Sequence, residues 1–295
     1  MIVFLTSQFI LAQGCSDAGL CTIGDLKSGG GNDSAKSKIT LAETFGLADP
    51  IALIQITQLE FQHNLTPSTS LFLKIPFQVS YGDLGIIGGT GDFTTSVSQV
   101  VYKRSDKKLL LMAGTVIPTN NSDLKIGNRT LPMQYQSSLG TYDLILGSIY
   151  SYKKWRFMIG YQHPFNSNDN GFLFSKWKDN KNAQNTAYFE SNNFNRGDDF
   201  IIRIERKFKL KSSTIFVSAL PIQRLQKDEI TKNGEIIKLK GSDELTLNLN
   251  FMWVKPISKK LAFTFVYGSP IIWRKTRADG LTRPVVITTS LSWKY

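Results

Sequence analysis

Apolar and polar residues alternate with a period of two along most of this chain, and this pattern strongly restricts what it can fold into. Between residues 69 and 81 one set of alternate positions is apolar and the other is mainly polar, with Phe72 and Pro76 as exceptions. A period of two places successive side chains on opposite faces of a β-strand. Proline cannot donate a ladder hydrogen bond, so we expect an irregularity at Pro76. The same pattern predicts twelve strands, at residues 38–47, 51–63, 69–81, 92–103, 108–117, 138–152, 155–165, 198–209, 212–225, 243–255, 260–274 and 284–295.

A helical membrane protein is excluded, because no stretch reaches the ~18 consecutive apolar residues that a transmembrane helix needs. A transmembrane β-barrel remains compatible with the ordinary hydrophobic content of 41%. Its strands alternate lipid-facing and lumen-facing residues, so their average hydrophobicity is unremarkable.

The connections between the expected strands alternate in length. The short ones are residues 66–68, 104–107, 153–154, 210–211 and 256–259, and the long ones lie near 82–91, 118–137, 166–197, 226–242 and 275–283. Outer-membrane barrels have short periplasmic turns and long extracellular loops. We therefore predict an all-β fold over residues 38–295: a single closed antiparallel transmembrane β-barrel of about 12 strands in a bacterial outer membrane.

The N-terminal residues read as the end of an export signal followed by a periplasmic segment. Residues 1–14 are apolar and then small, typical of a partial signal peptide, although a buried strand is an alternative. Residues 15–37 form a periplasmic N-terminal segment and linker, and nothing in them predicts a plug-forming helix. Cys15 and Cys21 permit a disulfide in an oxidising periplasm. Lipidation of Cys15, or two free thiols, are the alternatives.

The chain ends with apolar residues at alternate positions and a terminal aromatic, in Leu291, Trp293 and Tyr295. This ending resembles the signal that the outer-membrane insertion machinery reads. We therefore expect that machinery to be a partner of the last strand.

Three short motifs resemble known barrels. They are Cys15-Ser16-Asp17-Ala18-Gly19-Leu20-Cys21-Thr22, Gly91-Asp92-Phe93 and Gln136-Ser137-Ser138-Leu139-Gly140-Thr141-Tyr142-Asp143. The first resembles the start of mature outer-membrane barrels from Bacteroidota, and the others resemble FadL-type and phenol-degradation-associated transporter barrels. The resemblance implies a barrel fold and, more weakly, transport, since related barrels also serve as accessory subunits.

The net charge of +12 is concentrated around four short turns. The bases there are Lys103, Arg104, Lys107, Lys108, Lys153, Lys154, Lys207, Lys209, Lys211, Lys255, Lys259 and Lys260. In a barrel they would form one periplasmic ring, which suits anionic membrane lipids. An acidic periplasmic or outer-membrane protein is an alternative partner, and a ring of solvated turn lysines is another. No interleaved aromatic platform accompanies the bases, so nucleic acid is not an expected partner.

The polar face of the strands predicts a charged lumen. Its expected charges are Lys74, Asp92, Asp143, Arg156, Arg203, Glu205, Lys207 and Glu244. Opposite charges can line a polar pore or close a narrow barrel with ion pairs. The leading hypothesis is a channel or transporter for small polar or amphipathic solutes. The alternative is a non-conducting structural or accessory subunit of an outer-membrane complex.

No enzymatic motif is convincing. A barrel phospholipase would need a serine activated by a nearby histidine. His163 precedes Ser167 by four residues with Pro164 between them, which does not match that family's spacing. We expect no cofactor, and neither histidine has the spacing of a metal ligand. The loop at 166–197 carries six aromatic residues, which favour a lid or a partner contact over a solvated loop.

Overall fold

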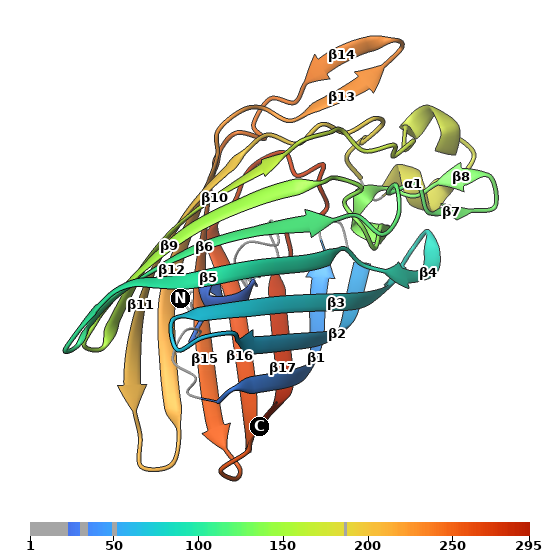
Figure 1. Cartoon of the computed structure of the whole chain (residues 1–295). Helices are drawn as coiled ribbons and strands as arrows, with labels where there is room; N and C mark the ends of the chain where they lie inside the picture. The colour runs from blue at the N-terminus through green and yellow to red at the C-terminus, as the bar shows by residue number, and fades with distance from the viewer. Residues whose placement is uncertain (1–22, 30–34, 49–51, 186–187) are drawn as a thin grey trace, which may run out of the picture.

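The computed structural model describes residues 23–29, 35–48, 52–185 and 188–295 and shows a closed antiparallel barrel of twelve strands (Figure 1). The barrel strands are β1 (Ser37–Ala48), β2 (Ala52–Asn64), β3 (Thr69–Gly82), β5 (Phe93–Arg104), β6 (Lys107–Ile117), β9 (Asp143–Tyr152), β10 (Trp155–Pro164), β11 (Asp199–Lys209), β12 (Thr214–Arg224), β15 (Leu245–Pro256), β16 (Leu261–Ile272) and β17 (Val285–Lys294). Each pairs with its neighbours in chain order, and β17 returns to β1. The predicted fold and all twelve predicted strands are confirmed. Residues 1–22, with the signal and both cysteines, lie outside the described residues.

The two faces of the wall differ as the alternation predicts. Leu41, Ile75 and Ile159 on the outer face are 55%, 50% and 52% exposed. Thr40 and Lys74 on the inner face are 4% and 8% exposed. The outer face therefore presents apolar side chains to lipid, and the polar residues are turned into the lumen.

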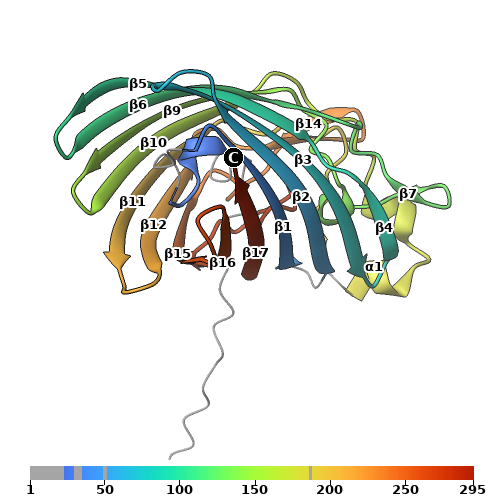
Figure 2. The ribbon, with the colours of Figure 1, turned by 60° about the horizontal axis from the view of Figure 1, so that its bottom comes forward.

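The barrel closes where the first strand meets the last, at a seam between β1 and β17 (Figure 2). The backbone amide of Ser37 donates to the carbonyl of Tyr295 at 2.9 Å. On the lumen side, the Thr44 and Thr288 hydroxyls lie 2.8 Å apart. Another hydroxyl pair across the seam, Thr40 and Ser292, has the same separation.

The expected irregularity at Pro76 is a change of pairing partner. The first half of β3, up to Lys74, pairs with β5. The second half, from Phe77 onward, pairs with β4 (Gly85–Thr90). Pro76 lies between the two ladders, where a backbone N–H is not required. Its carbonyl accepts a hydrogen bond from Gly91 at 2.8 Å.

The two ends of the barrel differ, as Figure 1 shows. One end carries the short turns. The other carries the long loops, with the short elements β7 (Lys125–Ile126), β8 (Arg129–Thr130), η3 (Met133–Tyr135), η4 (Phe174–Trp177), α1 (Lys181–Asn185), β13 (Glu229–Lys232) and β14 (Glu235–Lys238). Within the described residues, no helix is long and apolar enough to cross a membrane.

Candidate functional site

Residues 23–29, which we call the plug, lie inside the barrel around the short helix η2 (Gly24–Leu26) (Figures 1 and 2). Ile23 and Leu26 are fully buried. They belong to one apolar cluster with inward side chains of the wall, namely Phe72, Leu110, Met112, Val116, Ile145, Ile149, Met158, Ile201, Leu220 and Ile222. Gly147 of β9 makes room for the plug, because a Cβ atom there would lie 2.8 Å from the Leu26 side chain. The plug thus fills the side of the lumen that faces β6–β12.

Two arginines of the wall hold the plug backbone. The Arg156 guanidinium donates to the carbonyl of Asp25 at 2.8 Å, and that of Arg203 donates to the carbonyl of Leu26 at 2.7 Å. Hydrogen bonds from charged donors are stronger than neutral ones. Both arginines were predicted as lumen charges, and their observed role is to anchor the plug.

Glu205 completes this anchor. It lies two residues after Arg203, on the same face of β11. It is 1% exposed and accepts a hydrogen bond from Arg156 at 2.6 Å. It also accepts from the Ser28 hydroxyl and, at 3.2 Å, from the Gly29 amide. The ion pair between Arg156 and Glu205 therefore neutralises two buried charges, and both of its members also hydrogen-bond to the plug.

A cavity of about 420 Å³ lies on the other side of the lumen. Strands β15, β16, β17, β1, β2 and β3 form its wall, and the plug residues 27–29 also line it. Its lining includes small hydroxyl and apolar side chains: Thr40, Ala42, Thr44, Thr264, Val266, Thr288, Ser290 and Ser292. Charged residues also line it, with Glu60 paired to Lys27 of the plug and Lys74 nearby. The cavity is thus amphipathic and lies between the plug and the wall.

The long loops 118–142 and 165–198 fold over the barrel end, and we call them the lid. Phe172, Trp177 and Tyr188 are 0%, 3% and 1% exposed, whereas Phe174 is 38% exposed. The Trp177 indole donates to the carbonyl of Thr130 at 3.0 Å. This agrees with a lid and not with a bare solvated loop.

Polar contacts also join the two long loops to the rest of the barrel end. The hydroxyl oxygens of Tyr135 and Tyr188 lie 3.1 Å apart, and Tyr135 also accepts from the Leu84 amide at 3.1 Å. Burial raises the pKa of Tyr135, so this hydroxyl stays protonated. The lid is therefore held by hydrogen bonds as well as by apolar packing.

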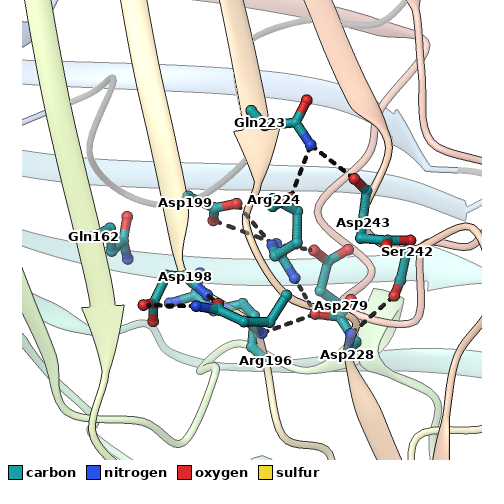
Figure 3. A network of polar contacts seen from close by, with 12 residues as sticks. Gln162, Arg196, Asp198, Asp199, Gln223, Arg224, Asp228, Ser242, Asp243 and Asp279 are labelled. Carbon is teal, nitrogen blue, oxygen red and sulfur yellow. Dashed lines mark hydrogen bonds and ion pairs between the residues drawn. The ribbon is translucent and has the colours of Figure 1, made fainter.

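A network of buried charges ties the remaining loops to the long-loop end of the wall (Figure 3). Arg224, 1% exposed, contacts Asp199 at 2.7 Å, Asp279 at 3.0 Å and Asp228. Arg274 donates to Asp279 at 2.7 Å. These residues come from β11, β12 and two different loops, so the network joins segments that are far apart in the sequence.

The two loop carboxylates of this network differ in the direction of their pKa shifts. Burial works to raise the pKa of Asp279, but Arg274 and Arg224 outweigh it and hold that pKa below its usual range. Burial raises the pKa of Asp228 despite the same two arginines. Asp279 accepts hydrogen bonds from both arginines and from the Leu281 amide, and these contacts stabilise its charged form.

Asp143, another predicted lumen charge, is fully buried at the start of β9. It accepts hydrogen bonds from Arg196 of the lid and from Gln162 of β10. The Thr141 hydroxyl donates to it at 2.7 Å. Asp143 therefore connects the lid to the wall, a contact that the strand pattern alone did not predict.

The remaining predicted lumen charges divide into three cases. Asp92 lines the cavity and accepts from the Leu139 amide at 2.9 Å. Lys207 is half-buried near the short-turn end, with its ammonium 5.7 Å from the centre of the Phe216 ring. Glu244 precedes β15, which begins one residue later, and it pairs with the exposed Lys275 at 3.2 Å at the long-loop end, so its role as a lumen charge stays a prediction.

The twelve predicted bases of the ring, which we call the basic collar, lie at or beside four short turns on one rim. Backbone contacts join adjacent turns there: the Lys153 amide donates to the Asp106 carbonyl at 3.2 Å, and the Lys207 amide donates to the Lys154 carbonyl at 2.8 Å. Most of these side chains are exposed. The geometry supports a ring, while its binding role stays a prediction.

His163 lies on the outer face of β10 near the long-loop end, 2.7 Å from Asp198. Tyr161 also donates to Asp198 at 2.7 Å. Within the described ranges, no group of three histidine, cysteine or acidic residues could hold a metal ion.

The plug was the main feature that the sequence analysis missed. The only signal for it is the spacing of Ile23 and Leu26, two apolar residues three apart in an otherwise polar segment. A single turn of 3₁₀-helix has that spacing, but so do many loops.

The fold is that of the outer-membrane β-barrels. No protein-family model matches the sequence, and no curated protein matches it. An outer-membrane channel from Pseudomonas putida F1 is similar in structure, with a TM-score of 0.62 and 12% identity over 90% of this chain and 97% of that one. The NanC porin has a TM-score of 0.49 and 8% identity, over 88% of this chain and all of that one. The CymD monoaromatic hydrocarbon channel has a TM-score of 0.46 and 7% identity, over 97% and 98% of the two chains. At these identities the likeness concerns the fold.

Proposed function

We propose that this protein is an outer-membrane channel for small polar or amphipathic solutes. The observation that supports it best is the cavity of about 420 Å³, which lies between the plug and the part of the wall formed by β15, β16, β17, β1, β2 and β3. Its size lies within the range of small-molecule sites. Its lining of hydroxyl and apolar side chains suits a solute that has both characters.

The plug and the lid are the proposed gates of this channel. The plug fills the side of the lumen that faces β6–β12, and the lid covers the long-loop end. In this proposal, movement of either segment widens the path that a solute takes to the cavity. If neither moves, the barrel is the non-conducting accessory subunit, which is the alternative function.

Filling the cavity tests the proposed function. Ala42 is 2% exposed and lines the cavity, so Ala42→Phe should lower the rate at which small sugars or amino acids swell proteoliposomes by at least severalfold. Ile159→Phe is the control, because Ile159 lies on the outer face of β10 and is 52% exposed. Equal rates for both variants and the parent would contradict transport through this cavity. No swelling by any of the three proteins would favour the accessory role.

The C-terminal residues Trp293 and Tyr295 are 53% and 59% exposed. We propose that the insertion machinery of the outer membrane reads them, together with Leu291.

We also propose that the basic collar binds anionic lipid headgroups on the periplasmic side. A base near an anionic surface contributes about 1 kcal/mol, so three or four engaged residues exceed a typical surface ion pair. Replacing Lys153, Lys154, Lys259 and Lys260 together by glutamine should weaken insertion into anionic vesicles. Insertion into neutral vesicles is the control and should not change.

The effect should also shrink as salt rises, because screening acts within about 8–10 Å at moderate ionic strength. A quadruple variant that inserts like the parent into both kinds of vesicle would show that the collar is ordinary solvated charge.

A further inference from the structure

A carboxylate lies in the middle of the lipid-facing surface, where apolar residues are expected. Glu43 of β1 lies on the outer face, in the same row along the strand as Ile39, Leu41, Phe45 and Leu47, which are 38–55% exposed. It is six residues from Ser37 and five from Ala48, the two ends of the strand. At about 3.3 Å per residue, this places Glu43 near mid-height in the apolar belt.

Two side chains of β2 hydrogen-bond to this carboxylate. The Gln55 amide donates to one oxygen at 2.7 Å, and the Thr57 hydroxyl donates to the other at 2.7 Å. Thr289 of β17 lies directly opposite on the other neighbouring strand. We call Glu43, Gln55 and Thr57 the Glu43 cluster.

Apart from Thr289, the neighbours that flank the cluster are apolar. Its flanking pairs across β1, β2 and β17 are Leu41 with Leu59, Leu41 with Leu291, and Phe45 with Ile287. On the outer face of the twelve strands that the structure describes, Glu43 is the one carboxylate. Arg206, an outward-facing base, lies three residues from the short-turn end of β11 and contacts the Trp155 ring.

Placing a carboxylate in hydrocarbon costs free energy. The two hydrogen bonds satisfy only part of its capacity to accept hydrogen bonds. A carboxylate can accept about four hydrogen bonds, and two are made within the cluster. Ionisable groups at membrane depth usually face another protein segment or water and not lipid. The side of the cluster that faces lipid therefore calls for a polar protein neighbour.

The composition of the cluster suits a second copy of the same cluster as its neighbour. An acceptor, Glu43, lies beside an amide donor, Gln55, whose second N–H can donate outward. A two-fold axis between two such faces places each Glu43 against Gln55 of the other copy, which is the self-complementarity that a symmetric dimer requires. Between β1 and β2 the long-loop end has only residues 49–51, whereas the next connection at that end spans residues 83–92 with β4 included. A second barrel can thus approach this part of the wall.

We propose that the β1–β2 face packs against a second copy of this chain in the membrane, with the two Glu43 clusters hydrogen-bonded to each other across a two-fold axis. The apolar residues Leu41, Phe45 and Leu59 pack around this contact. The contact lies on the outer face, so it does not depend on whether the lumen transports a solute.

The test is the mass of the full-length protein in mild detergent and in nanodiscs, measured by light scattering and native mass spectrometry. The parent should be a dimer in both. Glu43→Leu should weaken dimerisation at least tenfold, because reciprocal hydrogen bonds are lost. Glu43→Gln should keep the dimer, since an amide can form the same contacts. Ile159→Ala, on the outer face of β10, is the control and should leave the dimer intact.

Cross-linking locates the contact independently. In a Cys15→Ser and Cys21→Ser background, Leu41→Cys should form an intermolecular disulfide on oxidation, and Ile159→Cys should not. Heat-modifiable migration on gels shows that each variant has a folded barrel. A monomeric parent in both detergent and nanodiscs, or equal dimerisation of Glu43→Leu and the parent, would overturn the proposal.

Discussion

Replacing Ile23 and Leu26 together by serine should open the barrel and raise its conductance in planar bilayers severalfold. Burial of each of these side chains stabilises the plugged state by roughly 1.5–3 kcal/mol. Losing both therefore shifts the ratio of plugged to unplugged barrels by a factor of at least about a hundred, at 1.4 kcal/mol for each factor of ten. The anchors Arg156, Arg203 and Glu205 would then hold the plug with less help from apolar packing.

The control for this prediction is Leu65→Ser in the β2–β3 turn, where the side chain is 56% exposed. It should behave like the parent. Unchanged conductance of the Ile23 and Leu26 double variant, in barrels shown to be folded, would contradict the gating role of the plug. A higher conductance with unchanged solute selectivity would show that the cavity, and not the plug, selects the solute.

Replacing Arg224 by methionine should destabilise the barrel by about 3–5 kcal/mol, because removing one partner of a buried ion pair leaves uncompensated charge. Asp228 and Asp279 would keep only Arg274, and Asp199 would lose its ion pair with Arg224. The measurement is the urea midpoint of unfolding in detergent, followed by tryptophan fluorescence. Arg224→Lys should fall between the parent and the methionine variant, since it keeps the charge and loses the planar fork.

Arg129→Ala is the matched control for the buried network. Arg129 also forms an ion pair with an aspartate, Asp179, at 2.6 Å, but the two side chains are 37% and 70% exposed. Exposed pairs contribute at most about 1 kcal/mol. If the Arg224 and Arg129 variants unfold at the same urea concentration, the buried network does not hold the loops.

The barrel wall could be predicted from the sequence because its determinant is local. In β3, alternate residues face lipid and lumen, and a single period of two fixes the orientation of all of them. The two exceptions also have structural reasons. Phe72 faces inward and packs in the plug cluster, and Pro76 marks the change of partner from β5 to β4.

The contents of the lumen could be predicted only in part. The alternation correctly predicted that Arg156, Arg203 and Glu205 face inward. It could not show that they bind the plug, whose residues lie more than a hundred positions earlier in the chain. The position of Glu244 illustrates the same point. Its position fits the inward phase of β15, but the strand starts after it, and strand ends depend on loop contacts that no local period encodes.

The seam between β1 and β17 has a consequence for the order of folding. Its paired hydroxyls, Thr40 with Ser292 and Thr44 with Thr288, are 252 and 244 residues apart in the chain. Contacts of such long sequence separation form slowly, because the entropy of closing the intervening loop must be lost first. The ten other strands can form as successive hairpins, but this pair needs both ends of the chain at once. The cylinder is therefore completed last, and until then its interior is open from the side, which gives residues 23–29 a route to their place that does not require threading through a finished ring.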